Sequence, residues 1–417
     1  MKNILFATLV DINSLDESGI YQDLMRELIS LGNKVYIISP AEKRQNIPTR
    51  FSRKDYGGIL KVRIGNIQKT GKIRKGVSTL TLEKKIVKAV SKYFDEIQFD
   101  LVIYSTPPVT FCKLVKFIKN RDGAKSYLLL KDIFPQNAVD LGLLSRRSFV
   151  YRHFKKKEKT LYELSDQIGC LSQANVEYLL KCNPHIDSKK VHVCPNSISP
   201  APFMGAPDEN KKNAIREKYE IPPGKKVFVY GGNLGKPQSV DFIVSCLKIN
   251  RIKDDRYFLI CGEGTDAGVI SKFIKEEKPD NVKLLKLLPQ AEYDELLLAC
   301  DIGLIFLDHR FTIPNFPSRL LSYMQCGLPV LVCTDSNTDV GKTVVDGEFG
   351  WWCASDNSKY FSQFADEICK IDDETLKSVG RKGRQYLEDN FLASQAAKTI
   401  YESSFGWQIE IVSHLIF

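Results

Sequence analysis

The chain has 417 residues, of which 43% are hydrophobic and 26% are charged, and its formal net charge is +10 at pH 7. This length exceeds what one ordinary hydrophobic core serves, so we expect two domains of roughly 200 residues each. The excess of positive charge favours an anionic partner, namely a membrane surface, a phosphorylated ligand or a nucleic acid.

Cysteine usage and hydropathy indicate the cellular compartment. The eleven cysteines are scattered through apolar segments without a Cys-x-x-Cys pair, which favours buried, reduced thiols in a cytosolic protein over a disulfide framework. The apolar run at residues 4–10 reaches Asp11 without a small-residue cleavage site, so it is interpreted as a buried strand and not as a signal peptide. No run approaches the ~20 apolar residues of a membrane-spanning helix.

Strand and helix patterns alternate through the first half of the chain. A strand at residues 4–10, a helix at about 19–31 and a strand at 35–39 are typical of a parallel, doubly wound α/β sheet. Residues 53–75 carry eight basic side chains and one acid, and this stretch is interpreted as a solvated surface loop. Further strands are predicted at residues 101–104, 127–130, 167–171 and 191–193.

The domain division follows from a change in composition near the middle of the chain. Residues 200–224 contain five prolines and are predicted to link an N-terminal domain, residues 1–199, to a C-terminal domain, residues 225–390. Residues 391–417 are expected to pack back on the first domain or to end as an apolar tail.

Two glycine-rich turns follow predicted strands of the second domain, at residues 231–235 and 262–264. Glycines at strand ends allow the backbone to approach a phosphate, although they also have a simple conformational explanation. Neither turn is a Gly-x-Gly-x-x-Gly or Walker motif, which disfavours a dinucleotide-dependent enzyme or an ATPase.

The stretch from Phe311 to Cys333 reads as a proline-rich loop, a helix with Ser318 as its N-cap, and a buried strand. A helix that starts beside the end of a parallel sheet presents free backbone N–H groups to a phosphate. Arg319 opposes the helix dipole there, so its guanidinium is predicted to have another partner, which a diphosphate would suit. An ordinary loop and helix of an α/β protein is the structural alternative.

A charged loop at residues 131–142 directly follows a predicted buried strand. Lys131 and Asp132 lie at the strand end, which is the usual position of working side chains in an open α/β sheet. The alternative for Asp132 is that it caps the turn before Pro135.

Residues 145–165 are predicted to form a basic helix, with Val150, Phe154, Leu161 and Leu164 on one side. A basic helix with an apolar face is typical of an interfacial segment on anionic lipid. A nucleic-acid partner is disfavoured because the region lacks a stacking platform and a recognition-helix motif. The cations predicted to face the membrane or a lipid-linked acceptor are Arg146, Arg147, Arg152, Lys155, Lys156 and Lys157.

Several of these segments resemble the family 4 glycosyltransferases, which are retaining enzymes of the GT-B fold. The resemblance lies in Pro-Ser-Arg at residues 317–319, Gly-x-Pro-Val at 327–330, the loop at 131–142 and the turn at 230–239. The two glutamates that usually mark this family correspond here to Pro314 and Ser322, and the usual Arg and Lys of the glycine turn correspond to Asn233 and Gln238. The resemblance implies two Rossmann-like, doubly wound parallel-sheet domains facing across a cleft, with no metal or cofactor.

The resemblance, combined with the predicted positions of these residues at strand ends and helix starts, also implies roles for individual residues. Catalytic or leaving-group contacts are expected at Asp132, Lys131, Lys236 and Arg319. Donor contacts are expected at Gly19, Gly232, Asn233, Gly262, Glu263, Gly264, Leu288, Phe316, Ser318 and Ser322. For Gly19, a simple role at the start of a helix is the alternative.

The implied reaction is transfer of a sugar, such as an N-acetylated amino sugar, from a nucleotide sugar that we expect to be UDP-linked. The expected acceptor is a polyprenyl-diphosphate-linked sugar of a bacterial surface polysaccharide (O-antigen or capsule), and the expected location is the cytoplasmic face of the cell membrane. Two alternatives stay open, namely a sugar-nucleotide epimerase and a non-catalytic subunit that binds a sugar nucleotide.

Overall fold

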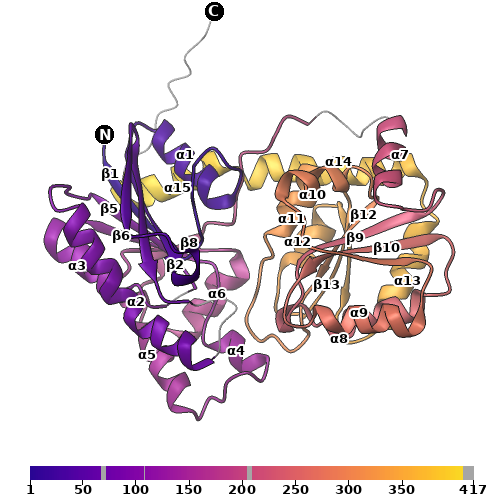
Figure 1. Ribbon diagram of the computed structural model, residues 1–417, viewed down its shortest axis with the longest axis horizontal. Coiled ribbons are helices and arrows are strands. Elements are labelled where there is room, and N and C mark those ends of the chain that lie inside the picture. Colours follow the sequence, from indigo (N-terminus) through magenta and orange to yellow (C-terminus); the bar gives the residue numbers. More distant parts are fainter. Residues whose placement is uncertain (67–71, 108, 204–208, 407–417) are drawn as a thin grey trace, which may run out of the picture. The chain divides into compact units, whose positions relative to one another are not determined.

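The computed structural model describes residues 1–66, 72–107, 109–203 and 209–406 (Figure 1). They divide into two compact units. Unit 1 consists of Met1–Ser199 together with the described residues from Leu392 on, and unit 2 consists of Pro200–Phe391. The tail at residues 407–417, for which an apolar character was noted in the sequence, lies outside the described residues.

Unit 1 is built on an eight-stranded sheet with the order β3-β4-β2-β1-β5-β6-β7-β8. Among the described residues, β3 and β4 pair antiparallel, whereas the other neighbouring strands pair parallel. The central strands are mostly apolar and are buried along most of their length, as parallel strands covered by helices usually are. The strands are β1 (Asn3–Ala7), β2 (Lys34–Glu42), β3 (Arg50–Lys54), β4 (Gly57–Ile64), β5 (Leu101–Ser105), β6 (Lys125–Leu130), β7 (Gln167–Cys170) and β8 (Val191–Val193).

The last described helix of the chain belongs to unit 1. Figure 1 shows this helix, α15 (Ala393–Phe405), beside α1 (Ile20–Ser30). Its small side chains Ala396 and Ala397 are buried, which allows the two helices to approach closely. The other helices of unit 1 are α2 (Lys72–Tyr93), α3 (Cys112–Asp122), α4 (Gln136–Asp140), α5 (Phe149–Leu164) and α6 (Gln173–Cys182), with the short 3-10 helices η1 (Lys43–Gln45) and η2 (Ser188–Lys190).

The interpretation of residues 53–75 as a surface loop is wrong for their described part. The hairpin of β3 and β4 covers most of it, and α2 begins at Lys72. Gly57 has a φ of +127°, and a Cβ there would lie 2.4 Å from the carbonyl oxygen of Val35, so only glycine fits this approach to β2. Lys61 of β4 is buried and forms an ion pair with Asp11.

Unit 2 is a six-stranded parallel sheet with the order β11-β10-β9-β12-β13-β14. Its strands are β9 (Lys226–Asn233), β10 (Arg256–Glu263), β11 (Val282–Leu285), β12 (Ile302–Phe306), β13 (Val330–Thr334) and β14 (Gly350–Ala354). Its helices are α7 (Glu209–Lys218), η3 (Lys236–Gln238), α8 (Val240–Asn250), α9 (Ala267–Glu277), α10 (Gln290–Leu297), α11 (Arg319–Gln325), α12 (Val340–Asp346), α13 (Ser358–Cys369) and α14 (Asp373–Asn390).

Helix α7 lies within residues 200–224, where the sequence predicted a linker. It is tied to the body of unit 2 by Arg216, whose guanidinium lies 2.8 Å from the carboxylate of Asp301. The predicted α/β class with two Rossmann-like parallel-sheet domains is confirmed.

Candidate functional site

The carboxyl end of β9 is packed tightly against its neighbour β10. A Cβ on Gly262 would lie 2.1 Å from the carbonyl oxygen of Gly232, and one on Gly264 would lie 2.1 Å from that of Leu234. Gly232 itself has a φ of +128°, and a Cβ there would lie 2.3 Å from a guanidinium nitrogen of Arg319. These glycines therefore let the two strand ends close up and bring Arg319 against the backbone.

Arg319 is the first residue of α11, and its guanidinium lies over the ring of Tyr230 in β9. The distance from Cζ to the ring centroid is 4.3 Å, which is within the range of a cation–π contact. Among the described residues no carboxylate forms an ion pair with Arg319, and its Nε is buried without a hydrogen-bond partner. A guanidinium stays charged at any physiological pH, so this group is suited to an external anion.

Two further tyrosines surround the same guanidinium. The hydroxyl of Tyr323 lies 3.0 Å from the carbonyl oxygen of Leu304, and the hydroxyl of Tyr293 is buried without a hydrogen-bond partner. Burial raises the pKa of Tyr323 to about 12 and the pKa of Tyr293 well above its ordinary value. Both phenols are therefore neutral at physiological pH, and they leave the charge of Arg319 uncompensated.

Lys236, the other cation predicted to meet a diphosphate, is placed differently. It lies in η3 after the glycine turn, its side chain is half exposed, and its Nζ lies 3.5 Å from the carboxylate of Asp266. Asn233 and Gln238 occupy the positions of the usual Arg and Lys. The side-chain amide of Asn233 donates to Gln238 Oε1 at 2.8 Å, so these two side chains bind each other. Lys236 already has an anionic partner, whereas Arg319 has none among the described residues.

The other residues predicted to bind the donor sugar nucleotide differ in their surroundings, and some are buried whereas others are exposed. Phe316 is buried, with its ring centroid 5.7 Å from that of Phe391, which makes it a packing residue. Ser318 stands at the N-cap position of α11, as predicted, although its side chain makes no capping hydrogen bond. Ser322 is half-buried, and so is Leu288 in the loop after β11. Glu263 is exposed at the end of β10.

In unit 1, the loop after β6 is held by Thr106. Its hydroxyl oxygen accepts hydrogen bonds from the backbone N–H groups of Lys131 at 2.9 Å and Asp132 at 3.1 Å. The carboxylate of Asp132 accepts from the side-chain amide of Asn137 in α4, with both oxygens at 2.8 Å. Burial raises the pKa of Asp132 to about 6, against the opposing effect of hydrogen bonds from Ile133 and Asn137.

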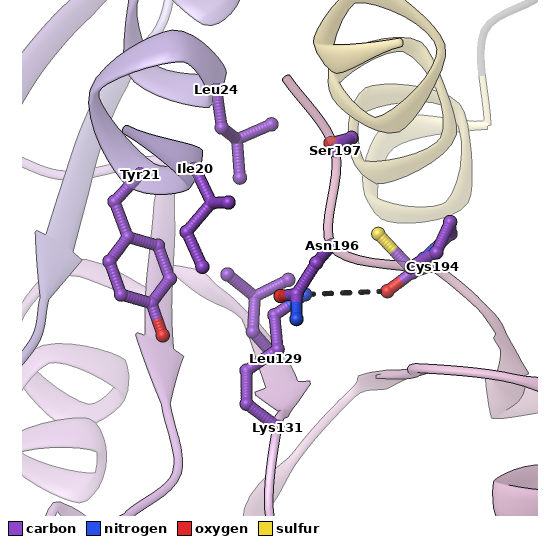
Figure 2. Close-up of a pocket in the computed structure, with 9 residues that line it drawn as sticks. Ile20, Tyr21, Leu24, Leu129, Lys131, Cys194, Asn196 and Ser197 are labelled. Atoms are coloured by element: carbon purple, nitrogen blue, oxygen red, sulfur yellow. Dashed lines mark hydrogen bonds between the residues drawn. The ribbon is translucent and has the colours of Figure 1, made fainter. Parts of the chain in front are cut away.

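Lys131 points into a small pocket of unit 1 (Figure 2). Its Nζ lies 3.5 Å from the carbonyl oxygen of Cys194, and burial lowers the pKa of its ammonium group. The side-chain oxygen of Asn196, another residue of this pocket, is buried without a hydrogen-bond partner. The pocket is lined by Ile20, Tyr21, Leu24, Leu129, Lys131, Cys194, Pro195, Asn196 and Ser197.

Gly19 lies just before α1, at its N-cap position. Its backbone N–H donates to the Asp23 carboxylate at 3.2 Å, and a Cβ on it would lie 2.5 Å from the side-chain oxygen of Gln22. The bond to Asp23 ties Gly19 to the first turn of α1, in line with the alternative role of Gly19 at the start of a helix.

The apolar side of the basic helix α5 is used within unit 1, so the expectation that it lies on lipid is wrong for most of its length. Leu161 is buried, and the ring centroid of Phe154 lies 5.0 Å from that of Phe134. Val150, in the first turn of the helix, exposes half of its side chain.

Two of the predicted lipid-facing cations of α5 also have partners within unit 1. Lys155 lies 2.5 Å from the buried carboxylate of Glu158, and Lys157 lies 3.1 Å from the buried carboxylate of Glu83. Both lysines therefore have an anionic partner within unit 1, and their contact with a membrane stays a prediction. The remaining members of the predicted set are exposed: Arg146, Arg147, Arg152 and Lys156.

Metal sites and membrane spans are the remaining classes of feature. The described residues contain no cluster of three or more His, Cys, Asp and Glu side chains arranged to hold a metal ion. None of the described helices has the length and hydropathy needed to span a bilayer.

Comparison with known proteins gives a family match and two relatives. Residues 211–386 match the family described as Glycosyl transferases group 1. The probable glycosyltransferase WbjE of Pseudomonas aeruginosa is 26% identical over 299 residues, which are 70% of this chain and 71% of that protein. The putative colanic acid biosynthesis glycosyl transferase WcaI of Escherichia coli (strain K12) is 20% identical over 244 residues, 58% of this chain and 59% of that protein.

Solved structures are similar over nearly the full length. Sucrose-phosphate synthase from Thermosynechococcus elongatus has a TM-score of 0.74 at 14% identity, covering 96% of this chain and 98% of its own. Anabaena Alr3699/HepE in complex with UDP-glucose has a TM-score of 0.66 at 13% identity, covering 97% and 99%. These likenesses show the GT-B fold. With the family match and the named relatives, they support a glycosyltransferase as the class of this chain.

Proposed function

We propose that this chain is a retaining glycosyltransferase of family 4 that transfers a hexosyl residue, such as an N-acetylated amino sugar, from a UDP-linked donor. The observation that carries the proposal is the guanidinium of Arg319, which lies at the end of β9 without an acidic partner among the described residues. A nucleotide diphosphate supplies the paired anionic oxygens that a guanidinium binds best.

In the proposed reaction, negative charge develops on the departing diphosphate, which Arg319 binds. The bond between the anomeric carbon and UDP breaks, the acceptor oxygen forms the new bond on the same face, and the acceptor proton leaves with the UDP phosphate. A fixed cation in aromatic surroundings stabilises the departing diphosphate without reorganisation, which is the basis of electrostatic catalysis. Lys236 supplies a second, more exposed charge when its contact with Asp266 opens.

In unit 1, we assign Asp132 to contact with a sugar hydroxyl. Its carboxylate is fixed by Asn137, and a pKa of about 6 leaves it mostly ionised at neutral pH. Lys131 is assigned a positioning role, because its ammonium group donates to the carbonyl of Cys194 within the pocket.

The names of the relatives support the biological context of the proposal. WcaI is described as a colanic acid biosynthesis enzyme, and HepE was solved with UDP-glucose. We therefore propose a lipid-linked acceptor, of the polyprenyl-diphosphate class, in the synthesis of a bacterial surface polysaccharide. The proposed location is the cytoplasmic face of the membrane.

A donor and acceptor panel tests the proposal. The purified chain is incubated with UDP-, GDP- and dTDP-linked hexoses and N-acetylhexosamines, with and without a lipid-linked sugar acceptor, and the products are separated by mass and by sugar stereochemistry. A glycolipid formed only with a UDP-sugar is the expected result, and Arg319→Ala is the matched control. An epimerised nucleotide sugar would identify an epimerase instead, and binding without turnover would identify a non-catalytic subunit.

A further inference from the structure

Three strongly exposed hydrophobic side chains lie close together in the sequence, where α4 leads into α5. Leu143 is 62% exposed, Phe149 is 76% exposed and Val150 is 50% exposed. We call these three residues the tip apolars. Single exposed hydrophobic side chains are ordinary, but a cluster of them marks a surface that another apolar phase covers.

The backbone holds the tip apolars in their exposed position. The N–H groups of Leu143 and Leu144 donate to the carbonyl oxygen of Ala138 at 2.8 and 3.1 Å. The hydroxyl of Ser148 caps α5 by accepting from the N–H of Tyr151 at 3.1 Å. The loop between the two helices is therefore ordered by hydrogen bonds at both ends.

The charged side chains of residues 141–157 all have the same sign. Residues 141–157 contain no aspartate or glutamate. Four exposed cations there form no ion pair with a described carboxylate, and the amino terminus of α5 adds the positive end of its dipole. We call these four residues the tip cations: Arg146, Arg147, Arg152 and Lys156.

The combination of groups identifies the surface that fits. Unpaired cations attract anionic head groups, and adjoining exposed apolar side chains gain free energy by entering the boundary with the acyl chains. The phosphates of a nucleic acid would pair with the cations but would leave most of the tip apolars in water. Among the tip apolars, Phe149 alone has an aromatic ring that could stack on a base.

We propose that the tip apolars and tip cations dock unit 1 on an anionic membrane surface. The three apolar side chains enter the head-group region, and the four cations bind lipid phosphates. This inference rests on the membrane location given in the proposed function and deepens it, because it names the surface of unit 1 that meets the bilayer.

Vesicle sedimentation with the full chain tests the proposal. The vesicles contain equal amounts of phosphatidylglycerol and phosphatidylcholine, and pure phosphatidylcholine vesicles serve as the reference. Replacing all four tip cations by Gln should weaken binding at low salt by at least a hundredfold, since each cation near such a surface contributes roughly fivefold. Replacing the tip apolars by Ser should weaken binding by at least tenfold and remove the fraction that survives high salt.

Matched variants separate these effects from net charge and from general hydrophobicity. Replacing Lys272, Lys275, Lys342 and Lys370 by Gln removes the same charge from exposed positions of unit 2, and Ile252→Ser removes an 82% exposed apolar side chain there. Both controls should bind vesicles as the unaltered chain does. UDP binding, measured in all variants, distinguishes failure of the membrane proposal from failure of the proposed function.

Two results would overturn the membrane proposal. One is equal sedimentation of the tip variants and the unaltered chain with anionic vesicles. The other is loss of self-association, with unchanged vesicle binding, when the tip apolars are replaced, which would assign the surface to a second copy of this chain.

Discussion

The guanidinium of Arg319 lies over the ring of Tyr230, with 4.3 Å between Cζ and the ring centroid. The two residues come from elements far apart in the sequence, the first turn of α11 and the strand β9. The ring fixes the orientation of the cation and leaves its charge in place, whereas an aspartate or glutamate would neutralise that charge. An oriented but uncompensated charge is what a diphosphate site requires.

Replacing Arg319 should impair catalysis without unfolding the chain. We expect Arg319→Ala to lower turnover by on the order of a hundredfold or more, because positioned electrostatic groups commonly contribute that much. Arg319→Lys should recover only part of the loss, since an ammonium group lacks the planar fork of a guanidinium. Steady-state rates and thermal melting of both variants are the measurements, and wild-type turnover in Arg319→Ala would remove this residue from the mechanism.

The ring of Tyr230, more than its hydroxyl, should matter for nucleotide affinity. Tyr230→Leu should weaken UDP binding by about fivefold, which corresponds to a cation–π contact of about 1 kcal/mol. Tyr230→Phe keeps the ring and loses the hydrogen bond that the hydroxyl donates to the carbonyl of Asn233 at 2.7 Å. Calorimetric titration with UDP should therefore separate the two variants, and equal weakening in both would assign the effect to the hydroxyl.

Transfer should depend on pH through Asp132. Because burial raises its pKa to about 6, the carboxylate is ionised at neutral pH, and the rate should fall as the pH drops through about 6. Asp132→Asn should depress transfer at neutral pH and remove this limb of the pH profile, while UDP affinity stays within a few-fold. A profile that keeps its acid limb in Asp132→Asn would place the titrating group elsewhere.

Neighbouring lysines of α5 should differ in their effect on stability. Lys155→Gln leaves the carboxylate of Glu158 buried without its cation, so we expect a loss of about 1–3 kcal/mol at pH 7. Lys156→Gln, at an exposed position, should change stability by less than about 0.5 kcal/mol.

The pH dependence of this loss has a definite sign. Burial raises the pKa of Glu158, and Lys155 lowers it. Once the pH falls below that pKa, the protonated carboxyl group no longer needs the cation, so the difference between Lys155→Gln and the unaltered chain should shrink. Urea unfolding at neutral and acidic pH measures this, and a constant difference would contradict the ion-pair account.

Much of the fold follows from local pattern. The apolar runs of β1, β9 and β13 predict buried parallel strands, because a strand covered on both faces is largely apolar. The contact of Arg319 with the ring of Tyr230, outside its own helix, agrees with its position, since a cation in the first turn of a helix opposes the dipole and needs another partner.

The hairpin of β3 and β4 cannot be predicted from local sequence pattern. β3 is almost entirely exposed, and β4 begins with two glycines. The side chains of β4 are buried because β4 pairs in parallel with β2. Charge density along the chain suggested a loop because the partner strand lies elsewhere in the sequence.

Periodicity along the chain shows which side of an element is apolar, and tertiary structure decides what covers that side. Lys131 and Asp132 are adjacent in sequence, yet one points to the carbonyl of Cys194 and the other is held by Asn137. Lys155 and Lys156 are equally basic in the sequence, yet only the former meets a buried carboxylate. Such partners are set by packing between distant segments, and a linear pattern of residue types carries no information about the distances that packing creates.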